Sequence, residues 1–289
     1  MKQPPVTIIM RSFNEAWALR DTLPALEMQS YRNWQLIVID SGSTDGSQEL
    51  IRAAHPLHFI EIEPGTYIPG KVLNRGMELA DTELCIFLNA DATPQDENWL
   101  SALVEALSKP GVGACFGCQI PRPDCEAVYA CDYERCFGKH RESASWDHFF
   151  SMVSSGVRKS VWKERPFRED LQYAEDDEYT RWCRNAGYEI AYAAESIVMH
   201  SHNYTAPEIF KRSFGDAKAI AKSSPGKIAP SWVSHVALGW VKDFKKDLHY
   251  CVANGRVGEL PHAMQIRWHQ RRGNLAGTVA GLESAAASR

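Results

Sequence analysis

The sequence of 289 residues has no apolar run of the length that a bilayer-spanning helix requires. Its first residues also lack the charged and apolar regions of a secretory signal peptide, so we expect a cytoplasmic protein. The eight cysteines lack the repeated pairs of a zinc finger, since Cys115 and Cys118 form a single C-x-x-C without a second pair. Cysteines scattered in this way fit a reducing compartment.

Glycine is missing where a dinucleotide-binding enzyme needs it. The first predicted strand, residues 6–10, is followed by residues 11–15, which contain no glycine. A NAD-dependent oxidoreductase carries G-x-G-x-x-G at this point, and a sugar-nucleotide pyrophosphorylase also has a glycine-rich loop there. The sequence therefore disfavours both classes.

Basic charge is scarce in most of the chain and concentrated at its end. Residues 206–289 contain 13 Lys and Arg against 6 Asp and Glu, a net charge of +7, whereas the remaining 205 residues carry 19 against 30, or −11. An acidic body gives no support for nucleic-acid binding. The basic end fits either an anionic partner, such as a membrane surface, or a solvated helical face.

The composition is that of a globular protein with a sizeable core, at 44% hydrophobic and 24% charged residues. Three short apolar runs, residues 6–10, 36–39 and 84–88, end in polar motifs and are typical of strands buried on both faces of a parallel sheet. Helical patterns alternate with these runs. This order predicts an α/β protein with a doubly wound sheet.

Local signals predict the other elements. Ser12-x-x-Glu15 has the pattern of a capping box for the first helix, and Pro24 is expected to kink or divide that helix. Aromatic and charged residues over 118–150 favour a substrate-facing segment or lid. Further elements are expected as strands near 59–62, 189–193 and 196–200, as helices near 47, 71–80, 97–107, 175–185 and from 207 onward, and as a left-handed cap at Gly187.

The polar motifs at the strand ends predict one site, because ligands of such sheets bind at the carboxyl ends of the strands. The motifs are Arg11–Glu15, Asp40–Gly46 and Asn89–Asp91. Asp91 offers the hard oxygen ligand that a divalent cation prefers. A strand-end Asp is also a common helix cap, so both interpretations stay open.

Two later clusters also contain groups that suit catalysis. Glu175–Glu178 opens a helix with four acids; the helix dipole alone could account for them, or one could serve as a general base. His200 and His202 alternate along an expected strand and would share one face, as metal ligands, phosphate donors or structural histidines.

Taken together, these residues resemble the family-2 glycosyltransferases, over approximately residues 5–205. Five motifs occur in the family's order. They are Val6–Glu15, Asp40–Gly46, the Gly70-Lys71…Asn74-x-Gly76 helix start, Asn89-Ala90-Asp91 at the family's Asp-x-Asp position, and Glu175-Asp176. The tail at His200–Thr205 is most similar to the rhamnosyltransferase-like branch.

The resemblance implies a GT-A fold, with a doubly wound mixed sheet flanked by helices in a catalytic domain over 1–205. Residues 206–289 would form a basic helical C-terminal extension. It also implies an inverting transfer of sugar from a UDP- or dTDP-sugar to a glycan or lipid-linked acceptor, in surface polysaccharide synthesis. The extension could mediate peripheral membrane contact or homodimerisation.

The resemblance also implies roles for single residues. Asp176 matches the catalytic base, with Glu175 as second choice, and Asp91 with His200 or His202 would hold Mg²⁺ or Mn²⁺. The residues expected to bind the nucleotide sugar are Arg11, Ser12, Asn14, Glu15, Asp40, Ser41, Lys71, Asn74, Asn89, Ala90 and Arg158. Ser41 and Asn89 stand where the family has aspartates, so a catalytically weak or inactive sugar-nucleotide-binding relative is the alternative.

Overall fold

We describe the protein from a computed structural model that defines residues 3–146, 148–223 and 230–287. The chain divides into two compact units. Unit 1 comprises Met1–Ile120, Ser143–Leu171 and Glu175–His200, and unit 2 comprises Pro121–Glu142, Gln172–Ala174 and Ser201–Arg289. The aromatic segment over 118–150 is therefore shared between the two units.

Unit 1 is built on one eight-stranded mixed sheet, with strand order β3-β2-β1-β4-β7-β6-β8-β5. β1, β2, β3 and β4 are mutually parallel, whereas β7 runs antiparallel to both β4 and β6. The strands are β1 (Val6–Ser12), β2 (Trp34–Asp40), β3 (His58–Glu61), β4 (Leu84–Asn89), β5 (Thr93–Pro94), β6 (Val112–Ile120), β7 (Ser154–Arg158) and β8 (Glu189–Met199).

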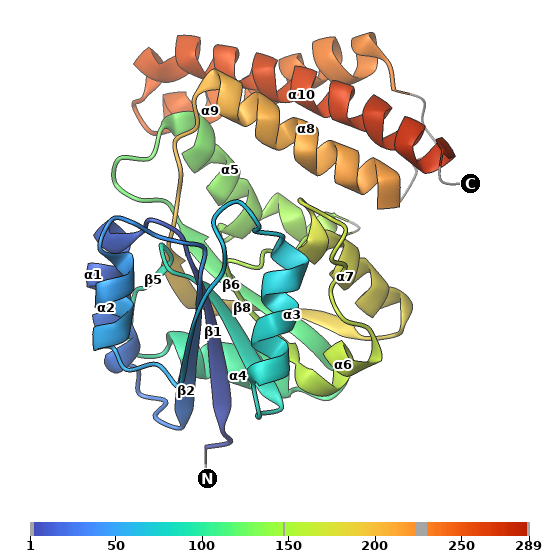
Figure 1. Ribbon diagram of the computed structural model, residues 1–289. Helices are drawn as coiled ribbons and strands as arrows, with labels where there is room; N and C mark the ends of the chain where they lie inside the picture. The colour runs from blue at the N-terminus through green and yellow to red at the C-terminus, as the bar shows by residue number, and fades with distance from the viewer. Residues whose placement is uncertain (1–2, 147, 224–229, 288–289) are drawn as a thin grey trace. The chain divides into compact units, whose positions relative to one another are not determined.

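Helices cover both faces of this sheet, and Figure 1 shows α1 and α3 on opposite sides of β1. Val6, Ile8 and Met10 of β1 belong to a buried cluster with α1, α2 and α4. On the other face, Phe87 of β4 meets Phe167 edge to face, with ring centroids 5.9 Å apart. The helices of unit 1 are α1 (Ala16–Glu27), α2 (Ser47–Ala53), α3 (Pro69–Leu79), α4 (Trp99–Ser108), α6 (Lys159–Glu164) and α7 (Glu175–Asn185).

Unit 2 is helical and is held together by close backbone packing and by buried ion pairs. A Cβ on Gly277 of α10 would lie 2.2 Å from the carbonyl oxygen of Phe214 on α8, so only glycine permits this approach. Arg267 is 2% exposed and bonds to Asp132 and Asp247, which ties three helices together. The elements are α5 (Ala127–Phe137), α8 (Ala206–Ser223), a π-helical turn (Val233–Leu238), α9 (Gly239–Ala253), a 3₁₀ turn (Val257–Glu259) and α10 (Leu260–Ala287).

Several local predictions were wrong. α1 continues through Pro24 without a break. The strands expected at 189–193 and 196–200 are one strand, β8, which ends at Met199, so His200 and His202 follow the strand instead of alternating along it. Arg158, expected to bind the nucleotide sugar, is the last residue of strand β7, a strand that was not predicted from the sequence.

Other predictions were confirmed. The helix expected at 175–185 is α7, and Gly187 after it has φ +91°, as a left-handed cap requires. The fold class was also predicted correctly, because the sheet is mixed and flanked by helices, and a helical region follows it. Within the described ranges, no helix combines the length and the apolarity that membrane crossing demands.

Candidate functional site

The carboxyl ends of β1, β2 and β4 lie side by side, as the sequence predicted. Ser12 is aligned with Asp40 of β2, and Arg11 is aligned with Asn89 of β4. We call this the site edge. Three polar motifs that are far apart in the sequence thus meet at one place in the sheet.

The turns after β1 and β2 are joined by hydrogen bonds. The Asn14 backbone N–H donates to Ser43 Oγ at 2.8 Å, and the Asn14 side-chain oxygen accepts from the Thr44 N–H at 2.9 Å. Asn14 has φ +55°, a conformation that asparagine tolerates better than most residues. Its side chain thus fixes the two turns against each other.

The first helix is capped from the second turn, not by its own capping box. The side chain of Glu15, the N-cap residue, makes no capping bond, and the Ala16 N–H donates to Asp45 at 2.9 Å. Burial opposes ionisation of Asp45, but hydrogen bonds from Ser47 and Ala16 outweigh it and lower the pKa of Asp45. The residue that caps α1, Asp45, is therefore 29 residues away in the sequence and not part of a local capping box.

Asp40 is fully buried and shapes the second turn. Its carboxylate accepts hydrogen bonds from the Gly42 and Ser43 N–H groups and from the Ser43 hydroxyl. Gly42 has φ +83°, and a Cβ there would lie 2.6 Å from Pro64, so glycine is required. Asp40 therefore positions Ser41 at the pocket and does not itself line it.

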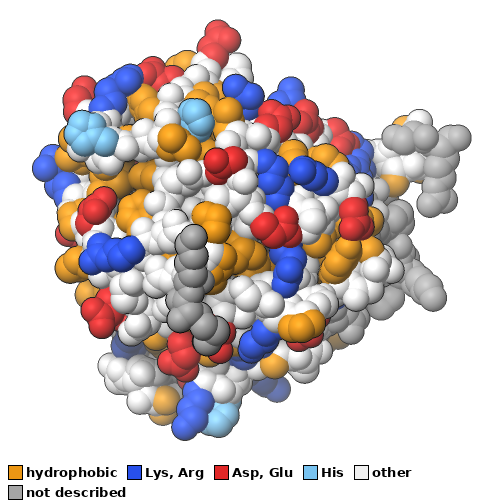
Figure 2. Space-filling view, turned by 90° about the horizontal axis from the view of Figure 1, so that it is seen from below, with side chains coloured by type: hydrophobic (Ala, Val, Ile, Leu, Met, Phe, Trp, Pro, Cys, Tyr) orange, Lys and Arg blue, Asp and Glu red, His pale blue; other side chains and the backbone are white. Residues whose placement is uncertain are grey.

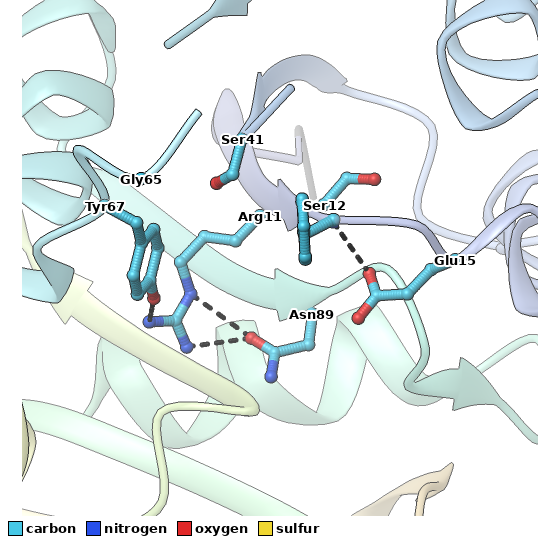
Figure 3. Close-up of a pocket in the computed structure, with 8 residues that line it drawn as sticks. Arg11, Ser12, Glu15, Ser41, Gly65, Tyr67 and Asn89 are labelled. Carbon is cyan, nitrogen blue, oxygen red and sulfur yellow. Dashed lines mark hydrogen bonds between the residues drawn. The ribbon is translucent and has the colours of Figure 1, made fainter. Parts of the chain in front are cut away.

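A pocket of about 390 Å³ opens at the site edge, within the usual size range of small-molecule sites. Its walls come from β1, β2, β4 and the loop after β3 (Figure 3). The lining residues are Arg11, Ser12, Phe13, Glu15, Ser41, Gly65, Tyr67 and Asn89. Five of these, Arg11, Ser12, Glu15, Ser41 and Asn89, were predicted from sequence.

Arg11 is the central cation of this pocket, and Figure 3 shows it between Tyr67 and Asn89. Its guanidinium donates two hydrogen bonds to Asn89 Oδ1, at 2.8 and 3.2 Å, and one to the Tyr67 hydroxyl at 3.1 Å. Glu175 Oε1 lies 3.7 Å from the same guanidinium. Burial opposes its charge, but Tyr67, Glu175 and the nearby Asp176 outweigh burial and raise the pKa of Arg11.

Glu15 lines the pocket, and its surroundings disfavour the ionised form of its carboxyl group. Burial raises the pKa of Glu15 to about 8, and the charge of Asp91 adds to this effect. Two carboxylates close together in a poorly solvated place repel each other. A cation bound between such groups would relieve the repulsion.

Replacing Glu15 by glutamine should stabilise the protein at high pH and leave it unchanged near pH 4. The folded-state pKa of about 8 lies above the unfolded value, so the folded state binds the proton more tightly and stability falls as pH rises between the two values. Glu15→Gln removes this cost, which is on the order of 5 kcal/mol at alkaline pH for a shift of this size. Thermal unfolding in chelator over this pH range measures it. The exposed Glu105→Gln is the control, and an equal gain at pH 4 contradicts the assignment.

Asp91 and His200 form the core of a candidate metal site. Asp91 is 2% exposed, and its Oδ2 lies 3.5 Å from His200 Nε2. His200 Nδ1 lies 2.9 Å from Gln119 Oε1, while Gln119 Nε2 donates to Ser151, which fixes the orientation of the amide. Because Oε1 only accepts, Nδ1 carries a proton, which leaves Nε2, the nitrogen that faces Asp91, as the one able to bind a cation.

This arrangement fits a divalent cation. A metal-binding histidine commonly donates its second ring N–H to a carbonyl oxygen, which is the bond that Gln119 accepts here. Asp91 supplies a buried carboxylate, and the carboxyl group of Glu15 lies close enough for the charge of Asp91 to help raise its pKa. His202, two residues beyond His200, belongs to the same group of candidate ligands. Asp91 and His200, both of unit 1, thus form a coherent donor pair.

The four acids at the start of α7 have different partners. Glu175 faces Arg11, Asp177 pairs with Arg181 at 2.9 Å, and Glu178 pairs with Arg165. Dipole capping alone would not distinguish the four positions in this way. Asp176, the second of the four acids, takes part in none of these three pairs.

Asp176 forms no ion pair with any residue that the structure describes. Its carboxylate accepts backbone N–H groups of Asp177 at 2.8 Å and Met152 at 3.3 Å. Burial raises the pKa of Asp176, and these N–H donors oppose the rise without cancelling it. A half-buried carboxylate with a raised pKa and without a salt-bridge partner is suited to accept a proton.

Six of the predicted binding residues do not line the pocket: Asn14 and Asp40 in the turns described above, Asn74, and the three residues that follow here. Arg158 ends β7 opposite Leu84, the first residue of β4, because β7 is antiparallel; this places it at the other edge of the sheet, and its inclusion in the site was wrong. Lys71 is exposed in the first turn of α3, and Ala90 is fully buried beneath the site edge.

The side-chain amide of Asn74 makes all four of its possible hydrogen bonds to other groups of the protein. Its amide donates to the Phe167 carbonyl and to Glu169, and its oxygen accepts from the Trp162 indole and the Phe167 N–H, all at 2.9–3.0 Å. At 4% exposure it ties α3 to the segment that precedes α7. These hydrogen bonds give Asn74 a structural role that requires no bound ligand.

Asn74→Ala is therefore expected to cost about 3 kcal/mol of stability, because it leaves buried polar groups of Trp162 and Phe167 without partners. Nucleotide affinity should stay within about two-fold of wild type. Chemical denaturation and calorimetric titration measure the two effects. The exposed Lys71→Ala is the matched control for stability, and a large affinity loss in a stable Asn74→Ala protein would restore its binding role.

Sequence reasoning missed Tyr67 and Gln119. Tyr67 lies in the loop after β3, and nothing in the sequence shows that its hydroxyl meets Arg11. Gln119 lies near the end of β6, a strand that was not expected, so its alignment with His200 was hidden.

Comparisons with known proteins identify the family of this chain. Residues 7–180 match the family model described as "Glycosyl transferase family 2". The chain is 31% identical over 220 residues to the O-antigen chain rhamnosyltransferase RfbN of Salmonella typhimurium, covering 72% of this chain and 70% of that protein. It is 30% identical over 225 residues to the O-antigen chain rhamnosyltransferase WbaN of Salmonella anatum, covering 73% and 70%.

Solved structures show the same fold. The mannosyltransferase PcManGT from Pyrobaculum calidifontis, in complex with GDP-Man and Mn²⁺, superposes with a TM-score of 0.68 at 21% identity, covering 98% of this chain and 88% of that one. Glucosyl-3-phosphoglycerate synthase from Mycobacterium tuberculosis, with Mn²⁺, UDP and phosphoglyceric acid, gives 0.57 at 15% identity, covering 78% and 81%.

Proposed function

Because the chain belongs to glycosyl transferase family 2, with the GT-A fold and with relatives in the rhamnosyltransferase-like branch, we propose a specific reaction for it. It transfers a sugar, with inversion, from a nucleoside-diphosphate sugar to a hydroxyl of a glycan or lipid-linked acceptor in surface polysaccharide synthesis. The observation that carries the proposal is that unit 1 holds a metal-type donor pair, Asp91 with His200, and a carboxylate without an ion pair among the described residues, Asp176, beside the same pocket. The charge of Asp91 acts on the pocket residue Glu15, and that of Asp176 acts on Arg11.

Asp91, His200 and His202 would hold the Mg²⁺ or Mn²⁺ ion. When bound, the ion neutralises charge that develops on the leaving diphosphate. Asn89, at the position of a family aspartate, contributes in another way: its amide oxygen accepts both bonds from Arg11 and adds no charge. The histidines would then compensate for the missing carboxylate as ligands.

Asp176 would take the proton from the acceptor hydroxyl as the new bond forms, and Glu175 would hold Arg11 in place beside it. The pocket formed by Arg11, Ser12 and Ser41 would enclose the nucleoside and its first phosphate. Asn14, Asp40 and Glu15 would support this pocket. Lys71, exposed at the start of α3, is the remaining candidate for a phosphate contact.

We base the proposed sugar donor on the names of the relatives. RfbN and WbaN are named as rhamnosyltransferases, which favours a rhamnose donor carried on UDP or dTDP. PcManGT was solved with GDP-Man, so GDP-sugars belong in the comparison. The acceptor would be the growing surface glycan on its lipid carrier. Contact of the C-terminal extension with a membrane or with a second copy would bring enzyme and acceptor together.

A thermal-shift panel of UDP-, dTDP- and GDP-sugars, with Mn²⁺ and with chelator, tests the proposal. A ligand that binds only the native state raises the melting temperature. We expect a shift with a UDP- or dTDP-sugar that requires Mn²⁺, followed by release of nucleoside diphosphate when acceptor is added. A shift without turnover for every acceptor identifies the inactive relative. No shift with any donor contradicts the function.

A further inference from the structure

Helix α9 of unit 2 turns both of its acids inward. Asp243 and Asp247 are 6% and 0% exposed and bond to Arg271 and Arg267 of α10. The negative charge of α9 is therefore neutralised inside the unit. Its outward face carries no acidic side chain.

The outward face combines apolar and basic residues. Val241, Leu248 and Val252 are 42%, 40% and 61% exposed. Lys242, Lys245 and His249 are also exposed. At 100° per residue these six positions span an arc of about 120°, with the apolar residues along one side and the basic residues along the other. We call these six residues the α9 face.

The basic side of the α9 face continues into a second pocket of about 440 Å³. Arg135 and Lys246 in this pocket both bind Glu142, so they are already neutralised in part. Lys139 and Lys245 form no ion pair within the described part of the chain. The lining residues are Cys131, Glu134, Arg135, Lys139, His140, Glu142, Lys245, Lys246, His249, Tyr250, Ala253 and Asn254.

We propose that the α9 face docks on an anionic lipid bilayer. Exposed aliphatic residues beside lysines, with acids excluded, are the features of a helix that lies in a membrane interface. The valines and Leu248 would enter the headgroup region, and Lys242 and Lys245 would contact lipid phosphates. The second pocket, with a volume of about 440 Å³, has room for one headgroup. Its lining carries four Lys and Arg against two Glu, so its net charge is positive.

A second copy of the chain is a poorer occupant. In a two-fold contact the same patch faces itself, and the α9 face would then set lysines against lysines without an acid to pair them. By contrast, the face that Figure 2 shows, seen from below the view of Figure 1, carries acidic and basic side chains interspersed. The segregation of charge on α9 thus favours a partner that is uniformly negative.

Vesicle sedimentation of the full chain tests this proposal without any sugar nucleotide, so its outcome is independent of the transferase assignment. We expect binding to phosphatidylglycerol-containing vesicles at low salt and no binding to pure phosphatidylcholine. Lys242→Gln with Lys245→Gln should weaken binding roughly 30-fold. Leu248→Ser with Val252→Ser should weaken it about 10-fold, including the part that survives high salt. All four positions are exposed, so melting temperatures should be unchanged.

The matched control is Lys109→Gln with Lys163→Gln, which removes the same charge from exposed sites in unit 1. It should change binding by less than two-fold. Three outcomes overturn the proposal. They are no binding to anionic vesicles at low salt, equal weakening by the α9 and control variants, or a dimer in sedimentation analysis that Leu248→Ser with Val252→Ser dissociates.

Discussion

Asp176→Asn is expected to lower kcat by about 10²–10⁴-fold while donor affinity stays within a few-fold of wild type. The substitution is nearly isosteric, and the asparagine oxygen can still accept the backbone N–H of Asp177. What is lost is the ability to take a proton. Initial rates at saturating donor and acceptor, with calorimetric titration of the donor, separate the two quantities.

The pH dependence gives this prediction a second readout. The raised pKa of Asp176 means that the carboxyl group stays protonated to a higher pH than an ordinary aspartate. The acidic limb of kcat/KM should therefore lie above about pH 4, and activity should fall as pH decreases through it. Asp177→Asn, next in the chain and paired with Arg181, is the matched control and should keep most activity. Activity retained in Asp176→Asn but lost in Glu175→Gln would move the base by one position.

The same raised pKa has a cost in stability. A carboxyl group with a folded-state pKa above its unfolded value destabilises the fold as pH rises past the unfolded value. Asp176→Asn should therefore melt at a higher temperature than wild type at neutral pH, with no gain near pH 3. A substitution that removes activity but raises stability is expected where a catalytic group is held in an environment that disfavours its charge.

Elements with a continuous local pattern could be predicted from the sequence. The apolar runs of β1, β2 and β4 are buried on both faces, so their hydrophobicity alone identified them. Their polar ends then met at the site edge because parallel strands share one direction. This is why Arg11, Asp40 and Asn89 were placed together correctly.

Features that depend on distant partners could not be predicted. β7 has the sequence Ser-Ser-Gly-Val-Arg, and small residues suit its buried central position but carry no strand pattern. Its antiparallel direction moved Arg158 to the far edge of the sheet. Likewise the N–H of Ala16 is satisfied by Asp45 in another turn, which no local capping pattern reveals. The missed strand β6 also concealed Gln119.

Asp91→Ala is expected to reduce the affinity for UDP or dTDP in the presence of Mn²⁺ by about 100-fold or more. Asp91 is the carboxylate that faces His200 at 3.5 Å, and the nucleotide diphosphate would bind largely through the cation that it holds. In chelator, wild type and variant should bind the nucleotide equally weakly. Calorimetric titration in both conditions measures the difference.

A graded series separates the metal site from general damage. Gln119→Ala leaves all candidate ligands in place but removes the acceptor that holds the His200 Nδ1 proton, so Mn²⁺ affinity should fall about 10–100-fold. Asp91→Ala should also relieve Glu15, because the Asp91 charge helps to raise its pKa, and should therefore stabilise the metal-free protein at alkaline pH. Equal nucleotide affinity in wild type and Asp91→Ala, with Mn²⁺ and with chelator alike, would remove the metal from this site and leave Asp91 as a structural carboxylate at the end of β4.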